Sequence, residues 1–204
     1  MRNCPPMDRP LRILTALHSF EPGGVERVAL RLVTAWHEQG IDTPLLMGRE
    51  DGAMRSEWPG LAYRSLAVDG LETGWFETLW MIWHLPRQIR LIAPDVLFCA
   101  GNSYAVVAVA MKLRLGRACP PVMAKVSNDL ARKDMPWPVQ RAYRLWLRIQ
   151  GRFIDRFVGM ADPMREEIAK AMGVDSRRIT IINDPAMASR DIDCASADRA
   201  DWPL

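Results

Sequence analysis

The chain has 204 residues, of which 49% are hydrophobic, and a formal net charge of +3. That hydrophobic fraction supports a packed core, and so small a charge, spread along the chain, argues against a nucleic-acid-binding surface. The four cysteines stand far apart with no C-x-x-C pair, which argues against a metal site or a disulfide framework and fits a reducing cytoplasm.

No segment has the pattern of a signal peptide or a membrane span. The first ten residues hold three prolines and no apolar run, and the longest apolar run, at residues 105–111, is far shorter than the roughly 20 residues of a membrane helix. We therefore expect a cytoplasmic protein, with peripheral attachment to the inner face of the membrane as an alternative.

Short apolar runs alternate with amphipathic stretches along the chain. In order, the predicted strands span residues 11–17, 43–48, 62–67, 95–99, 121–126, 154–160 and 179–182. The predicted helices span residues 25–39, 75–92, 103–115, 137–152 and 162–172. Several strands are apolar throughout, which is typical of strands buried on both faces. The alternation predicts a single α/β domain with a Rossmann-like, doubly wound parallel sheet.

Local signals set the expected limits of the helices and of the domain. Gly40 and Gly173 stand where helix C-caps are expected, and Asp162 precedes a proline as an N-cap residue often does. We expect residues 1–10 to be a disordered tail and residues 11–185 to form the domain. Residues 186–204, which carry no clear period, are expected to be a linker.

A glycine pair separates the first predicted strand from the first helix. Gly23 and Gly24 would let backbone approach a ligand, and the first turn of the helix offers unpaired N–H groups at its positive end. This loop is a candidate anion site, and a tight turn that binds nothing is the alternative. His18 lies at the end of the same strand and is a second candidate, although a lone histidine is often a structural hydrogen-bonding group.

The same loop resembles the entry loop of family 4 glycosyltransferases of the GT-B type. The matching residues are Pro22, Gly23, Gly24, Glu26 and Arg27. A Pro-Asp-Val strand at residues 94–96 and an Ile-x-Asn segment within residues 179–185 also resemble this family. The resemblance implies the N-terminal, acceptor-side half of a GT-B fold. It further implies transfer of a sugar from a nucleotide sugar to an acceptor hydroxyl on a glycan or lipid, with no cofactor and no metal.

Family members carry a second, donor-binding domain with a Glu-x7-Glu motif, and the residues after 185 are too few to supply one. We therefore expect the chain alone to be inactive. It would be a fragment of an enzyme, the acceptor subunit of a split two-chain enzyme, or a non-enzymatic binding module. An open carboxyl edge of the sheet, with His18, Phe20, Tyr104 and the loop from Lys125 to Leu130 on it, would favour self-association or a partner chain.

Polar side chains follow two later strands of the predicted sheet. Asn102 and Ser103 would hydrogen-bond a sugar hydroxyl or cap the next helix. Many relatives carry a histidine at this place, and this sequence does not. Lys125, Asn128 and Asp129 resemble a loop that lines the acceptor side in some relatives, where they would bind hydroxyls or a phosphate, and a solvated loop is the alternative. No residue is assigned a catalytic role.

The predicted helix at 137–152 has a basic face. Three- and four-residue spacing places four arginines on one side, namely Arg141, Arg144, Arg148 and Arg152. Together with the tryptophans of this stretch, such a face suits an anionic membrane surface. The alternative is a solvated arginine face over a tryptophan-filled core.

Overall fold

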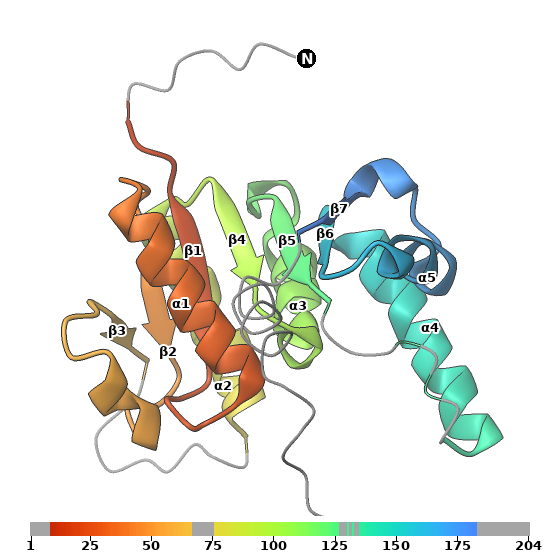
Figure 1. The fold of residues 1–204 in the computed structure, drawn as a ribbon, viewed down its shortest axis with the longest axis horizontal. Coiled ribbons are helices and arrows are strands. Elements are labelled where there is room, and N and C mark those ends of the chain that lie inside the picture. Colours follow the sequence, from red (N-terminus) through yellow and green to blue (C-terminus); the bar gives the residue numbers. More distant parts are fainter. Residues whose placement is uncertain (1–8, 67–75, 127–129, 131, 133–134, 183–204) are drawn as a thin grey trace, which may run out of the picture.

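The computed structural model describes residues 9–66, 76–126, 130, 132 and 135–182, which form an α/β fold (Figure 1). The strands are β1 Ile13–Leu17, β2 Leu45–Met47, β3 Arg64–Ser65, β4 Val96–Cys99, β5 Val122–Lys125, β6 Arg156–Gly159 and β7 Ile179–Ile181. The helices are α1 Gly24–Glu38, α2 Glu77–Ile92, α3 Ala105–Leu115, α4 Trp137–Phe153 and α5 Pro163–Met172. Four 3-10 turns complete the described elements: η1 Ala53–Glu57, η2 Asn102–Tyr104, η3 Gly116–Ala118 and η4 Ser176–Arg178.

Each predicted strand and helix is present, with ends that differ from the prediction by two residues at most. Gly40 and Gly173 take the left-handed backbone, with φ of 79° and 68°, that lets a chain leave a helix. Asp162 precedes α5 as predicted, but its side chain makes no capping hydrogen bond. The predicted linker and most of the predicted N-terminal tail lie outside the described residues.

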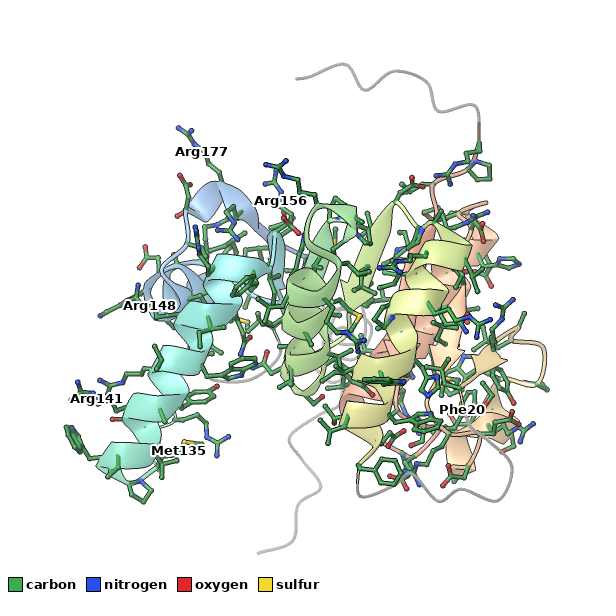
Figure 2. All side chains as sticks on the ribbon, turned by 180° about the vertical axis from the view of Figure 1, so that it is seen from behind. Phe20, Met135, Arg141, Arg148, Arg156 and Arg177 are labelled. Atoms are coloured by element: carbon green, nitrogen blue, oxygen red, sulfur yellow. The ribbon has the colours of Figure 1, made fainter. Side chains whose placement is uncertain are left out.

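The strands form one parallel sheet in the order β3-β2-β1-β4-β5-β6-β7. Right-handed crossovers place α1, which follows β1, on one face of the sheet. Helices α2, α3 and α4 lie on the opposite face, toward the viewer in Figure 2. This is the doubly wound, Rossmann-like fold that the sequence predicts.

The direction of winding reverses between β1 and β4. β1 leads to β2 on one side, whereas the chain returns from β3 to β4 on the other side of β1. The loops after these two strands therefore leave the carboxyl edge in opposite directions and open a crevice there. In open parallel sheets, ligands bind in such a crevice.

The core explains why the carboxyl edge keeps its shape. All five residues of β1 are buried, as expected for a central strand covered on both faces. Beyond the strand ends, Phe20 is also buried, and its backbone N–H donates to the Asp51 carbonyl at 2.9 Å. Gly52 has a φ of +128°, and a Cβ there would lie 2.0 Å from the Phe20 carbonyl carbon, so the close approach of the two loops requires glycine.

Candidate functional site

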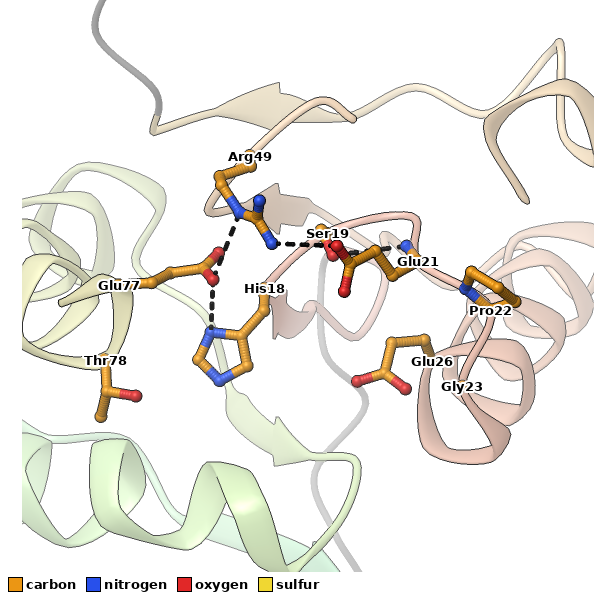
Figure 3. A pocket seen from close by; sticks show the side chains of 9 residues that line it. All are labelled: His18, Ser19, Glu21, Pro22, Gly23, Glu26, Arg49, Glu77 and Thr78. Carbon is orange, nitrogen blue, oxygen red and sulfur yellow. Dashed lines mark hydrogen bonds and ion pairs between the residues drawn. The ribbon is translucent and has the colours of Figure 1, made fainter. Parts of the chain in front are cut away.

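A cavity of about 410 Å³ opens at the carboxyl edge, beside the reversal point (Figure 3). Its walls come from the loop between β1 and α1, from the segment after β2 and from the start of α2. The residues that line it are His18, Ser19, Glu21, Pro22, Gly23, Glu26, Arg49, Glu77 and Thr78. Its volume lies in the range of small-molecule sites.

Glu77, the first residue of α2, is a buried carboxylate whose side chain is only 8% exposed. Its Oε2 lies 3.6 Å from Nδ1 of His18 and 3.4 Å from Nε of Arg49. Its Oε1 has no hydrogen-bond partner in the described part of the chain. A Cβ at Gly48 would lie 2.4 Å from that oxygen, so glycine at this position makes room for the carboxylate. The fold thus holds a carboxylate with unused hydrogen-bonding capacity beside the cavity.

Arg49 forms ion pairs with two of the glutamates that line the cavity and with a nearby aspartate. Besides Glu77, its guanidinium contacts Asp51 Oδ2 at 2.9 Å and Glu21 Oε1 at 3.4 Å. Partial burial disfavours the charged guanidinium, but the carboxylates of Glu77, Asp51 and Glu21 outweigh this and raise the pKa of Arg49. Arg49 is therefore a fixed cation whose charge its own neighbours already compensate.

Tyr104 ties the loop after β4 to both sides of the cavity. Its ring stacks on the His18 ring with centroids 4.6 Å apart, and the His18 backbone N–H donates to its hydroxyl at 3.1 Å. The hydroxyl donates to Glu26 Oε1 at 2.8 Å. Burial above all, together with the Glu26 carboxylate, raises the pKa of Tyr104 far above its usual range. Tyr104 therefore stays a proton donor that fixes both the His18 ring and Glu26.

The two glycines of the entry loop differ in their surroundings. A Cβ at Gly23 would lie 2.0 Å from Glu26 Oε2, so the carboxylate fills that space. A Cβ at Gly24 would meet nothing within 4 Å, and neither glycine has a positive φ. A side chain at Gly23 would therefore have to displace the Glu26 carboxylate, whereas the space beside Gly24, the first residue of α1, is open.

The charge of the cavity decides which ligand chemistry it suits. Three glutamates line it, and its arginine is already paired with carboxylates. Carboxylates repel an isolated anion but accept hydrogen bonds from hydroxyl groups. The interior of the cavity is thus suited to a hydroxyl-rich, uncharged group, whereas the helix N-terminus at Gly24 is the part suited to a phosphate.

The structure brings some of the predicted site residues together and separates others. His18 and Gly23 line the cavity, and Gly24 directly follows its wall. Asn102 and Ser103 form η2 after β4 and do not line it. Lys125 is buried at the end of β5, two strands from β1, and is likewise not in the lining. The predicted Asn128 and Asp129 lie outside the described residues.

Two sequence-based expectations are wrong. The residue at the N-cap of α3 is Tyr104, and no side chain caps that helix, so Asn102 and Ser103 are not helix caps. Phe20 and Tyr104 are buried rather than exposed on an open edge, because the loop after β2 covers the first and His18 stacks on the second.

Sequence reasoning missed Glu77 and Arg49. An acidic residue at the start of a predicted helix is normally an exposed partner of the helix dipole, and nothing local marks Glu77 as buried. Gly48, which directly precedes Arg49, was the available signal, because a glycine at the end of a strand often marks a close approach. Among the described residues, no cluster of histidine, cysteine or acidic side chains could hold a metal ion. None of the described helices is long and apolar enough to cross a membrane.

The fold is similar to that of several solved structures. The chain is similar to the lipopolysaccharide outer core galactosyltransferase WaaB, with 13% identity, a TM-score of 0.62 and coverage of 86% of this chain and 46% of that one. It is similar to Anabaena Alr3699/HepE, solved in complex with UDP and glucose, with 12% identity, a TM-score of 0.57 and coverage of 91% and 50%. It is also similar to a putative UDP-N-acetylglucosamine 2-epimerase from Listeria monocytogenes, with 14% identity, a TM-score of 0.58 and coverage of 95% and 49%.

At such low identity these structures establish the fold alone, and the chain spans about half the length of each. No curated protein matches the sequence. The family model described as Glycosyltransferase Family 4 matches residues 22–185, which begin in the entry loop and include α1, every later strand and most of the cavity wall. The chain belongs to glycosyltransferase family 4.

Proposed function

We propose that the chain is the acceptor-side half of an enzyme that transfers a sugar from a nucleotide sugar to an acceptor hydroxyl. The observation that carries this proposal is the cavity at the reversal point of the sheet, which combines a buried carboxylate, a histidine and an open helix N-terminus. In this proposal the acceptor hydroxyl lies near His18 and Glu77. The diphosphate of the donor approaches Gly24, where α1 offers its positive end.

The side chains near His18 and those near Gly24 differ in chemistry, and this difference supports placing the acceptor at the first and the diphosphate at the second. His18 turns Nδ1 toward Glu77, which leaves Nε2 as the ring nitrogen able to accept a hydrogen bond from a hydroxyl. At the other end, the carboxylates of Glu21 and Glu26 oppose a diphosphate unless cationic groups from elsewhere neutralise it. We therefore propose that a donor-binding half, from the same polypeptide or another, supplies those groups. No cofactor or metal is part of this proposal.

Two alternatives remain from different classes. The chain would be the acceptor subunit of a split two-chain glycosyltransferase, or a non-enzymatic module that binds a glycan in the same cavity. The DNA directly downstream distinguishes them from a two-domain enzyme. A donor domain in the same frame supports the two-domain enzyme, an adjacent separate gene supports the split enzyme, and neither supports the binding module. In each case we propose a cytoplasmic location, where nucleotide sugars are the available donors.

Amide NMR of the 204-residue chain tests the proposed site directly. On addition of UDP-glucose, and separately of glucose, we expect the amide signals of His18, Gly24 and Glu77 to shift first. Gly24→Val should remove the UDP-glucose response because its side chain fills the open space at the helix N-terminus, whereas Gly60→Val, at a glycine with equally open surroundings, should not. Shifts confined to residues outside the cavity would contradict the proposed site.

A further inference from the structure

The helices on the opposite side of the sheet from α1 expose several large apolar side chains, whereas α1 exposes none. The large apolar side chains exposed in the described part of the chain are Leu79, Trp83 and Leu91 on α2, Val106 and Leu113 on α3, Trp137, Val139 and Leu145 on α4, and Ile182. All but Ile182 lie on three adjacent helices, α2, α3 and α4. We call the exposed side of these three helices the helical face (Figure 2).

The helical face is also strongly basic. Two Lys or Arg residues lie on α2, two on α3 and four on α4, and the acidic residue of these helices is Glu77, which is buried. The net charge of the three helices is therefore more than twice that of the whole chain, which is +3. Lys112 of α3 is 16% exposed and pairs with Asp155 at 2.6 Å, so the exposed positive charge comes from the arginines. Helix α1, on the other side of the sheet, carries Glu26 and Glu38 against Arg27 and Arg31 and exposes no large apolar side chain.

Exposed apolar and basic side chains share one surface. On α2, Leu79, Trp83, Arg87 and Arg90 recur at three- and four-residue spacing and are all exposed. The Arg114 guanidinium, from α3, lies 5.1 Å from the Trp83 ring centroid and donates to the Ile82 carbonyl at 2.7 Å. The exposed sides of α2 and α3 therefore form one continuous surface.

Helix α4 extends this surface. Its N-terminal half projects from the body of the molecule (Figure 1), and Trp137 there is 69% exposed. Arg141 stacks against Trp137 with its guanidinium 5.8 Å from the ring centroid and points away from the sheet in Figure 2. Arg148 lies instead beside Gly173, at the end of α5. The expectation of a solvated arginine face over a tryptophan core thus fails at Trp137, which lies beside the arginines in solvent.

We propose that the helical face docks on an anionic phospholipid membrane. A partner for this face must be negatively charged and must accept tryptophan and leucine side chains beneath its charged layer, which describes a lipid headgroup region. A second copy of the chain is disfavoured because a symmetric contact would place arginines against arginines. The helical face and the cavity meet at the start of α2, where Glu77 and Thr78 line the cavity and Leu79 is exposed on the face. This inference is independent of sugar transfer.

Flotation of the 204-residue chain with vesicles tests the proposal. Vesicles of phosphatidylcholine mixed with phosphatidylglycerol should bind the protein, and vesicles of phosphatidylcholine alone should bind it much more weakly. Added salt should release it, because the attraction of the arginines is screened. The assay requires neither donor nor acceptor, so it can fail while the proposed function holds.

Matched variants assign the binding to this face. Arg87→Gln with Arg90→Gln removes two exposed charges from it, and Arg31→Gln with Arg177→Gln removes two elsewhere. No hydrogen bond or ion pair of these four side chains is seen among the described residues. The first pair should lower binding roughly thirtyfold, at the usual value of a basic residue near an anionic membrane. Leu113→Ser should lower binding roughly tenfold, whereas Ile182→Ser, at the exposed leucine-sized residue outside the face, should have little effect.

Three results would overturn the proposal: equal or negligible binding to both kinds of vesicle, an equal effect of the test and control variants, or a soluble dimer that Arg87→Gln with Arg90→Gln dissociates. The last result would assign the helical face to a second copy of the chain. Circular dichroism of each variant verifies that a loss of binding is not a loss of fold.

Discussion

At the scale of single residues, Glu77 gives the cavity its character. A carboxylate this buried persists only beside positive or hydrogen-bonding partners, and Arg49 and His18 lie within 3.6 Å of it. Its neighbours are arranged for it, since Gly48 leaves the space that its Oε1 occupies. Glu77 therefore links the end of β1, the end of β2 and the start of α2.

Removing this carboxylate should destabilise the domain. We expect Glu77→Ala to lower the free energy of unfolding by about 3 kcal/mol, because it leaves Arg49 and His18 partly buried without their shared partner. Glu38→Ala, at an exposed glutamate at the end of α1, should change it by about 0.5 kcal/mol or less. Urea denaturation measures both, and equal effects of the two substitutions would show that the contacts of Glu77 contribute nothing.

The buried thiols should be inert. Burial raises the pKa of the Cys99 thiol to about 12, and burial likewise raises the pKa of Cys119. Since the thiolate is the reactive form, the folded protein has almost none of it at neutral pH. In a Cys4→Ser, Cys194→Ser background, Ellman's reagent at pH 8 should therefore label neither thiol until denaturant is added. Rapid labelling of the folded variant would contradict the burial of these thiols.

At the scale of elements, α4 and α5 pack through a glycine. A Cβ at Gly151 would lie 2.1 Å from the Met172 carbonyl oxygen, which is backbone and cannot turn aside. We expect Gly151→Ala to lower the free energy of unfolding by about 2 kcal/mol, as overpacking of a well-packed contact does. Gly24→Ala, where the added methyl meets open space, should leave it unchanged or raise it by up to about 1 kcal/mol. Thermal unfolding of both variants checks this, and a Gly151→Ala domain as stable as Gly24→Ala would contradict the close contact.

The elements were predictable from the sequence and the details of the site were not. The type of each strand and helix follows from local hydrophobic pattern, which the fully buried β1 illustrates. His18 and Gly23 were found because the end of a strand and the start of a helix are visible locally. Glu77 lies 59 positions from His18, so their pairing depends on the path of the chain between β3 and β4. The expectation that Asn102 or Ser103 caps α3 was wrong because η2 inserts one turn before α3 begins.

At the scale of the whole molecule, two surfaces have different chemistry. The carboxyl edge holds an acidic cavity suited to hydroxyl groups, and the helical face is basic and apolar. The two surfaces meet at the start of α2, where Glu77 and Thr78 line the cavity and Leu79 belongs to the helical face. One molecule would then bind the membrane through the helical face and a hydroxyl-bearing acceptor through the cavity.

The structures that the chain resembles are about twice as long as the part it covers. Stabilising a leaving diphosphate requires charged and hydrogen-bonding groups on both sides of it, and the cavity supplies one side, with an excess of carboxylates. Transfer should therefore depend on the donor-binding half, and the Gly24 side of the cavity should face it.

The central claim is that this chain contributes the acceptor side of a shared active site, and nucleotide release from a nucleotide sugar tests it most directly. The rate is measured for the 204-residue chain alone and for the proposed whole enzyme, in which a donor-binding half is joined to the chain or mixed with it. We predict no appreciable release by the chain alone, and acceptor-dependent release by the assembled protein that Gly24→Val abolishes while the domain still folds. Ordinary enzymatic turnover by the chain alone, or full activity of the assembled Gly24→Val protein, would contradict this account.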